Sequence, residues 1–370
     1  MSMQRILNYG SSLQAYALKR LIETLDASVG VEFLDYVPGA PLLKPSAAPN
    51  TVSRVVAKVT EYGGVDARLR DKIRFLNHKR AYSRKYLPLI GVERELNHDL
   101  AVDVQVIGSD EVFNCVQSNT NVGFSRDLFG HDSSAARIVS YAASFGNTTI
   151  DRIVQYGVDD ILREDLEKLG AISVRDRNSA DIVETLTGVR PEIHVDPVLA
   201  YDFLGMEKRV PRGRARGGSY VIVYAYPGRI THEENLAIMN WAHGNGARVL
   251  CFGGVQECAD EFIDCDPFEL LAYFRDARAV VTDTFHGTIF SIINSTPFAT
   301  ILRPTVGDGY GNEEKLGYLL DLFGLRSRQA RDPLDIDRVL SSALDFHAVQ
   351  EVLVRERART LDYLRRAVLS

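Results

Sequence analysis

Short apolar runs, rich in β-branched residues and ending in small or polar residues, alternate with helical patterns along most of this chain. This alternation restricts the fold more than any other feature, because it is typical of βαβ units built around a parallel sheet. Four runs precede residue 206, at residues 103–110, 137–146, 171–176 and 191–202. Four more follow residue 219, at residues 220–226, 247–254, 277–283 and 298–303. The sequence therefore predicts an α/β fold with two Rossmann-like domains that face each other across a cleft.

Helical patterns separate several of these runs, over residues 177–187, Glu233 to His243, Pro267 to Asp276 and Thr288 to Asn294. The third pattern has the clearest start, because Asp266, Pro267 and Glu269 together form a capping box. For the first pattern, Asn178 or Ser179 is expected to cap the helix and Gly188 to end it.

The domain boundaries follow from composition. We expect an N-terminal domain over residues 1–205 that carries a basic helical insertion at about 54–98. Residues 206–219 are rich in Arg, Gly and Pro and lack periodicity, which is typical of a linker. A C-terminal domain over 220–346 follows, and residues 347–370 are expected to form an amphipathic helix that packs on the body of the protein.

The overall charge and cysteine content exclude several classes of protein. The formal net charge of −6 argues against nonspecific binding of nucleic acid. The four cysteines form no CxxC pair, and a disulfide framework is not expected in a chain of 370 residues. No apolar run approaches the roughly 18 residues of a spanning helix, and the amino terminus lacks the apolar core of a signal peptide. We expect a cytoplasmic protein with reduced thiols.

The insertion is locally basic in an otherwise acidic chain. Between Arg68 and Lys85 eight basic residues accompany a single acid, Asp71, in a pattern compatible with a helix. One interpretation is a solvated helical insertion, and the other is a patch for a lipid surface or an anionic acceptor. The terminal basic helix could likewise contact the inner face of the membrane. The sequence does not indicate the oligomeric state.

One histidine stands where ligands collect in such folds. In VVTDTFHGTIFSIINSTPF, the strand at residues 279–282 and the helix Thr288 to Asn294 leave His286 in the turn that joins them. That turn lies at the carboxyl edge of a parallel strand and the amino end of a helix, where backbone N–H groups favour anions. We therefore expect an anionic ligand beside His286.

The loops at the other strand ends suit proton transfer on a small anion. They are GSDEVFN, ASFGN, VRDRN and DTFHGT, which bring together small residues, carboxylates, an arginine and a histidine. The sequence has no metal-binding constellation and no GxGxxG or GxxxxGKS motif where a nucleotide would need it, so no metal or cofactor is expected.

Seven motifs, in order from Asn8 to about Arg328, resemble the polysaccharide pyruvyl transferase family. They are NYGSSLQAYAL, VIGSDEVFN, SYAASFG, SVRDRNS, HVDPVL, VVTDTFHGTIFSII and GNEEKLGYLL with the FGL and R that follow. The resemblance implies a fold similar to GT-B glycosyltransferases and the transfer of pyruvate, as a ketal, from phosphoenolpyruvate to a sugar. The expected partners are this donor and a sugar or lipid-linked oligosaccharide of a surface polysaccharide.

The family's histidine corresponds to His286, which the resemblance makes the first candidate for a general acid or base. A loop histidine that only caps the helix is the alternative. Asp110 is the second catalytic candidate or an acceptor for a sugar hydroxyl, and a helix N-cap is its alternative role.

The family's basic positions correspond to Arg175 and Lys315, which are expected to bind the donor. Arg175 has an ordinary ion pair with Asp176 or Asp196 as its alternative. The remaining donor candidates are Arg303, Gly287, Thr288 and Ser144. The candidates for the rest of the substrate pocket are Asn8, Gly10, Gln14, Ser109, Asn114 and Asn312. Of these, Gly10 permits close backbone approach.

Relatives begin with a full strand before the N-x-G motif, whereas Met1–Leu7 leave room for at most a short edge-like strand. The comparison with the family thus also raises the hypothesis that the start of this chain is shortened. The alternatives to a pyruvyltransferase are a GT-B glycosyltransferase that uses a nucleotide sugar and a catalytically inactive relative that binds glycan.

Overall fold

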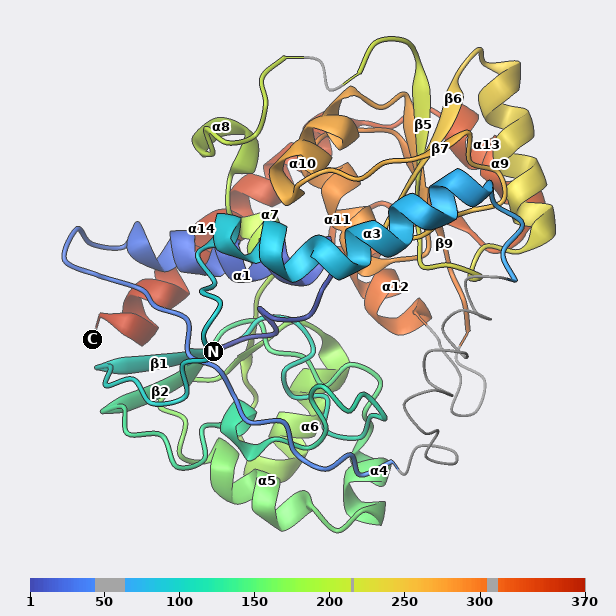
Figure 1. The fold of residues 1–370 in the computed structure, drawn as a ribbon. Helices are drawn as coiled ribbons and strands as arrows, with labels where there is room; N and C mark the ends of the chain where they lie inside the picture. Colours follow the sequence, from blue (N-terminus) through green and yellow to red (C-terminus); the bar gives the residue numbers. More distant parts are fainter. Residues whose placement is uncertain (44–63, 214–215, 305–311, 370) are drawn as a thin grey trace.

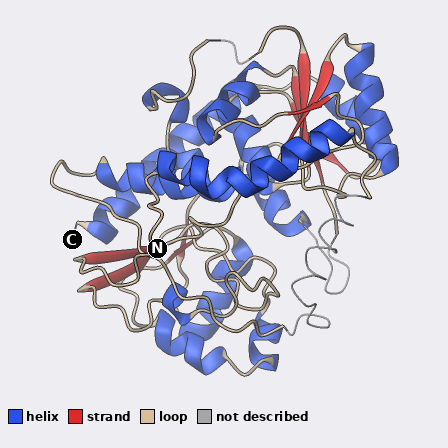
Figure 2. Cartoon of the chain, in the orientation of Figure 1, coloured by secondary structure: helices blue, strands red, loops and turns tan. Residues whose placement is uncertain are grey.

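The computed structural model describes residues 1–43, 64–213, 216–304 and 312–369 of the chain. Two α/β units lie one above the other in Figure 1, and helices cover both of them (Figure 2). Part of the predicted insertion, residues 54–63, lies outside the described residues.

The C-terminal unit is built on one parallel sheet. Its strands are β5 (Tyr220–Tyr224), β6 (Arg248–Phe252), β7 (Glu261–Phe262), β8 (Ala279–Thr282), β9 (Phe298–Ile301) and β10 (Gln329–Ala330). Their order is β10-β9-β8-β5-β6-β7. Read from β7, this is the 3-2-1-4-5-6 order of a Rossmann sheet, whose direction reverses between β5 and β8. All five residues of β5 are buried, because helices cover both faces of the sheet.

Helices of this unit follow the sequence signals closely. They are α9 (His232–Gly244), α10 (Pro267–Asp276), α11 (Phe285–Ile293), α12 (Glu313–Leu322), α13 (Pro333–Ser341) and the 3-10 turn η3 (Arg326–Arg328). The capping box predicted for α10 is present, with Asp266 and Glu269 in their reciprocal roles. Helix α11 begins three residues earlier than predicted, because the Thr284 side chain accepts a hydrogen bond from the backbone N–H of Gly287.

The N-terminal unit has shorter strands. They are β1 (Val104–Ile107), β2 (Arg137–Ser140), β3 (Ser173–Val174) and β4 (Glu192–Ile193), paired in parallel as β1-β2 and β3-β4. Single bridges from Val139 to Ala171 and from Ala143 to Val174 connect the two pairs. The long strand predicted at residues 191–202 is wrong: only its start is extended, because Asp196 caps the short helix α7 (Pro197–Ala200).

Other helices of this unit are α1 (Tyr9–Glu23), α4 (Ile150–Gln155), α5 (Asp159–Leu166), α6 (Arg177–Thr187) and α8 (Phe203–Met206), with 3-10 turns η1 (Leu87–Ile90) and η2 (Arg126–Phe129). The predicted N-cap of α6 is wrong, because Asp176 rather than Asn178 or Ser179 caps the helix. The predicted end at Gly188 is confirmed. No strand forms at Met1–Leu7, although the amino group of Met1 donates to the carbonyl of Val106 at 2.8 Å.

Two helices tie the units together. The C-terminal helix α14 (Phe346–Val368), red in Figure 1, runs back to the N-terminal unit, where the Tyr363 hydroxyl donates to the carbonyl of Ser140. Helix α1 packs against α7 and α10, and the Tyr9 hydroxyl donates to the carbonyl of Cys265. The largest hydrophobic core therefore runs through both units. This continuous packing holds their facing edges in a GT-B-like arrangement.

The basic insertion contains α3 (Leu69–Lys85), which lies along the C-terminal unit. Phe75 packs edge-on against Phe262, and Arg74 and His78 contact Glu261 and Asp264. Part of the basic excess in this helix is thus balanced by acidic residues of another domain. In the described part of the chain, no helix is long and apolar enough to span a membrane.

Candidate active site

A pocket of about 390 Å³ lies between the two units. The N-terminal unit contributes the start of α1 and the loops after β1 and β3. The C-terminal unit contributes the end of β5 and the amino ends of α11 and α12. The chemically active side chains on its wall are Asn8, Ser11, Asp110, Glu111, Arg175, Arg229, His286 and Lys315. The carboxyl edges of both sheets therefore meet at one site, where ligands bind in open α/β folds.

His286 lies in the first turn of α11 rather than in the turn before it. Its side chain keeps 13% of its surface exposed, and Nε2 is 3.6 Å from a carboxylate oxygen of Asp196. Nε2 is buried and forms no hydrogen bond with the described residues. The cap of this helix is Thr284, so the structure removes capping as the role of His286.

Asp196 connects the histidine to Arg175. It is fully buried, accepts a hydrogen bond from Nη1 of Arg175 at 3.0 Å, and caps α7 through the N–H of Val198. Burial alone raises the pKa of Asp196, but His286 and the Arg175 guanidinium outweigh it and keep the pKa below its ordinary value. Asp196 therefore faces the imidazole as a carboxylate.

From the sequence, Asp196 is expected only as an ion-pair partner of Arg175. Its signal was the DP pair in HVDPVL, which places a proline at the first helical position after a capping aspartate.

Arg175 is both ion-paired and part of the pocket wall. Its guanidinium contacts Asp196, lies 3.7 Å from Asp110, and sits 4.3 Å from the ring centre of Phe285. Arg175 therefore forms the ion pair with Asp196 that was its alternative role, and it also lines the pocket. Buried between two carboxylates, this arginine is held in one orientation at the cleft.

Asp110 is not a helix cap, because no helix follows it in residues 111–125. Its backbone φ is 71°, in the left-handed region that aspartate tolerates better than most residues. The carboxylate accepts a hydrogen bond from the Ser11 hydroxyl at 2.7 Å. With 16% of its side chain exposed, Asp110 can accept a second hydrogen bond from a ligand hydroxyl in the pocket.

Lys315 reaches across the cleft to Glu111, with 3.0 Å between Nζ and Oε1. Sequence analysis did not single out Glu111. Asn114, predicted to line the pocket, instead donates to Glu111 at 2.8 Å and fixes its carboxylate. The Lys315 ammonium, with help from Arg175 and despite burial, lowers the pKa of Glu111 to about 2.

The pH dependence of stability should report this ion pair. A lowered folded-state pKa contributes stability above the ordinary pKa of 4.5 and loses that contribution as the pH falls through about 2. We expect Glu111→Gln to have a lower melting temperature than the wild type at neutral pH, with the difference shrinking between pH 4.5 and 2. Thermal melts of both proteins across this range check the prediction. A difference independent of pH would show that the pair adds nothing.

Gly10 packs directly on the imidazole. A Cβ atom at this position would lie 2.2 Å from Nδ1 of His286, far inside contact distance. Gly10 is therefore needed for close approach between α1 and α11.

We expect Gly10→Ala to displace His286 and to lower kcat by about tenfold or more, because small misplacements of catalytic groups are costly. Overpacking should cost only about 1–3 kcal/mol of folding free energy. Kinetics and melting of this variant are compared with those of Gly317→Ala, whose added Cβ meets no atom within 4 Å. Normal turnover in Gly10→Ala would show that the helix simply shifts.

Of the other predicted pocket residues, one lines the pocket and two support its wall from behind. Asn8 lines the pocket and caps α1, accepting from the N–H of Ser11 at 2.7 Å. Gln14 is fully buried and accepts from the backbone N–H of Ser109. The Ser109 hydroxyl donates to the carbonyl of Ala142 and lies 3.5 Å from Asp196.

Besides Gly10, Gln14, Ser109 and Asn114, five further donor or pocket candidates do not line the pocket. Arg303 forms a bidentate pair with Glu234, with contacts of 3.1 and 2.7 Å. Ser144 donates to Asp176, and Asn312 donates to backbone carbonyls of Asp283 and Ile301. The remaining two are Gly287, whose N–H bonds the Thr284 hydroxyl, and Thr288, whose hydroxyl bonds Thr300. All five are occupied by internal contacts that sequence patterns do not reveal.

The start of α11 offers backbone donors to an anion. Thr284 caps the N–H of Gly287, while the N–H groups of Phe285 and His286 donate to none of the described residues. Both residues line the pocket, as does Arg229, which sequence analysis missed. Arg229 is held from behind, since its carbonyl accepts from Arg303 at 2.7 Å. Helix N–H groups and arginine together make an anion site.

Comparisons with solved structures give remote matches. A glycosyltransferase of kitacinnamycin covers 98% of this chain and 95% of that chain, at 13% identity and a TM-score of 0.41. The calicheamicin glycosyltransferase CalG4 covers 97% and 94%, also at 13% identity and a TM-score of 0.41. A Thermobaculum terrenum O-GlcNAc transferase mutant covers 72% of this chain but only 53% of that one, at 14% identity and a TM-score of 0.36. No curated protein matches the sequence.

A protein family model also matches most of the sequence. The family model described as polysaccharide pyruvyl transferase matches residues 8–303, which include α1, both sheets apart from β10, and the pocket wall as far as His286. On this match, the chain belongs to the polysaccharide pyruvyl transferase family.

Proposed function

We propose that the protein transfers the pyruvyl group of phosphoenolpyruvate to two hydroxyls of one sugar, as a cyclic ketal. The observation that carries the proposal is the line Arg175–Asp196–His286, which ends at the open N–H groups of α11. A fixed cation, a proton donor and an anion-binding helix end thus share one pocket. The reaction needs these three elements and a base, a role that we assign to Asp110, and it needs no further cofactor.

The donor carries a phosphate and a carboxylate, and the pocket can hold both. The N–H groups of Phe285 and His286 bind one anionic group at the helix end, where the helix dipole adds to the attraction. Arg175 binds the other through charge-assisted hydrogen bonds. Lys315 approaches the phosphate as it leaves, exchanging its contact with Glu111 for one with the product.

The chemistry divides between an acid and a base. His286, which lies 3.6 Å from Asp196, acts as the acid that gives a proton to C3 of the donor and makes C2 electrophilic. A sugar hydroxyl adds to C2 and its proton passes to Asp110. The bond from C2 to the phosphate oxygen then breaks, and a second sugar hydroxyl closes the ring. The second hydroxyl proton leaves with the phosphate, so one methyl ketal and one phosphate form.

The acceptor is a sugar of a surface or exopolysaccharide, or of its lipid-linked precursor. The family supports this class, and the pocket supports it through Asp110, Asn8 and Ser11, which offer hydrogen bonds to neutral hydroxyls.

Thermal stabilisation tests the donor. Phosphoenolpyruvate at 100 times its Kd should add about 2.7 kcal/mol to the free energy of unfolding, because it binds only the folded state. Melting curves with phosphoenolpyruvate, with UDP-sugars and with inorganic phosphate compare the candidates. Stabilisation by a UDP-sugar alone would instead support a nucleotide-sugar glycosyltransferase, and no stabilisation by any of them would support an inactive relative.

A further inference from the structure

Helix α3 has a second amphipathic face that points away from the protein. Its inner stripe, Asp71, Phe75, His78 and Tyr82, is buried. On the opposite side of the helix, at the same spacing, stand Leu69, Ile73, Leu76, Arg80 and Arg84. Leu69 keeps 74% of its surface exposed and Ile73 keeps 51%. Apolar side chains thus occupy the amino-terminal half of the outer stripe, and arginines occupy the other half.

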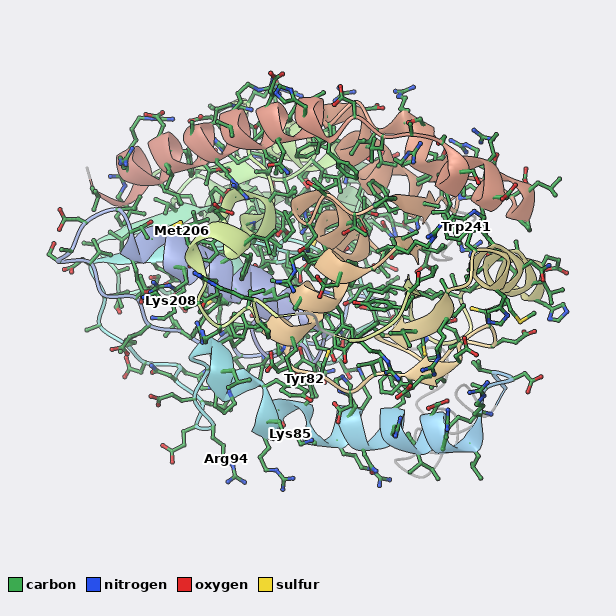
Figure 3. All side chains as sticks on the ribbon, turned by 90° about the horizontal axis from the view of Figure 1, so that it is seen from above. Tyr82, Lys85, Arg94, Met206, Lys208 and Trp241 are labelled. Atoms are coloured by element: carbon green, nitrogen blue, oxygen red, sulfur yellow. The ribbon has the colours of Figure 1, made fainter. Side chains whose placement is uncertain are left out.

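The charges of this outer face are of one sign. Arg80 and Arg84 are exposed and form no ion pair with the described residues, whereas Arg74 and Lys85 contact the acidic edge of the C-terminal unit. The only acid in α3, Asp71, is buried on the inner side. Figure 3 shows α3 along one edge of the molecule, with Lys85 and Arg94 on that edge.

We propose that the outer face of α3 docks on an anionic lipid surface. Exposed leucine and isoleucine beside unneutralised arginines are the features that place a helix in the interface of such a membrane. Each basic residue near the surface adds electrostatic attraction to anionic headgroups. The chain as a whole has a net charge of −6, so its overall charge gives no attraction to a membrane with negative charge. Charge complementarity therefore selects this face.

The position of α3 connects this face to the pocket. Lys79 donates to the carbonyl of Leu7 at 3.1 Å, next to Asn8 on the pocket wall. The Tyr82 hydroxyl lies 3.0 Å from that of Ser12 in α1. A protein docked through α3 would hold α1 and its pocket residues near the headgroups, where a lipid-linked sugar is found.

Vesicle co-sedimentation without substrate tests the proposal, and its outcome does not depend on the proposed reaction. The wild type should bind vesicles of phosphatidylcholine with phosphatidylglycerol, release them as salt is added, and ignore pure phosphatidylcholine. Arg80→Glu/Arg84→Glu should reduce binding about tenfold or more. Leu69→Ser/Ile73→Ser should reduce it at every salt concentration, because these side chains contribute by burial.

The matched control is Arg326→Glu/Arg338→Glu, which changes the net charge equally on exposed residues outside α3. It should bind vesicles like the wild type. Equal loss in this control would show an effect of overall charge and overturn the proposal. Absence of wild-type binding to the vesicles would also overturn the proposal. So would a wild-type dimer that dissociates in Arg80→Glu/Arg84→Glu while vesicle binding is unchanged.

Discussion

Replacing His286 with asparagine should reduce kcat by roughly 10²–10⁴-fold and leave the protein folded. Asparagine keeps a polar side chain in the first turn of α11, where Asp196 lies 3.6 Å from the imidazole, but it cannot give a proton to C3. Phosphoenolpyruvate should still bind, because Arg175 and the helix N–H groups are unchanged. Kinetics, donor affinity and melting temperature of the one variant measure the three effects separately.

His194→Asn provides the matched control. This histidine is more deeply buried than His286, contacts the Ser173 hydroxyl at 2.9 Å and packs against Tyr363, outside the active-site pocket. It should lose stability and keep turnover in the folded fraction. If His286→Asn behaved in this way too, the histidine would be structural.

Arg175→Ala should have two large effects, one on stability and one on donor binding. The substitution leaves Asp196 buried without its guanidinium partner, and breaking a buried pair from one side costs about 3–5 kcal/mol of folding free energy. Donor affinity should fall as well, by about 1.5–3 kcal/mol for a lost charge-assisted contact. Chemical denaturation and phosphoenolpyruvate titration measure the two losses.

A double variant separates these effects. Arg175→Ala/Asp196→Asn removes the unpaired charge as well. It should therefore regain much of the stability that Arg175→Ala loses, but none of the donor affinity. Recovery of both would mean that Arg175 acts only by keeping the fold. Recovery of neither would place the main partner of Arg175 elsewhere.

The strand and helix order could be predicted because it depends on local patterns. The buried strands of the C-terminal unit read as continuous apolar runs, and Asp266, Pro267 and Glu269 mark the start of α10 in the sequence itself. The N-terminal unit was harder, because strands such as Ser173–Val174 are too short to leave a periodic signal. The helix at Pro197 was hidden within an apolar segment that also fits a strand.

A site residue could be predicted only where the sequence motif around it indicates its role. Arg175 follows the end of β3, His286 lies in the first turn of the helix after β8, and both line the pocket as expected. Asp196 and Glu111 depend on partners 90 and 204 residues away, and no local pattern shows such contacts. The prediction that Arg303 binds the donor has the same weakness, because its ion pair with Glu234 appears only once the chain is folded.

The central claim is that this pocket joins the pyruvyl group of phosphoenolpyruvate to a sugar by protonating C3. The most direct measurement is mass spectrometry of lipid-linked and free sugar acceptors after incubation with the protein and phosphoenolpyruvate in deuterated water. The account predicts a sugar that has gained a pyruvate ketal, one deuterium in the ketal methyl group, and released phosphate, with all three lost in His286→Asn. A product without deuterium in the methyl group, or one that forms equally well in His286→Asn, would contradict it.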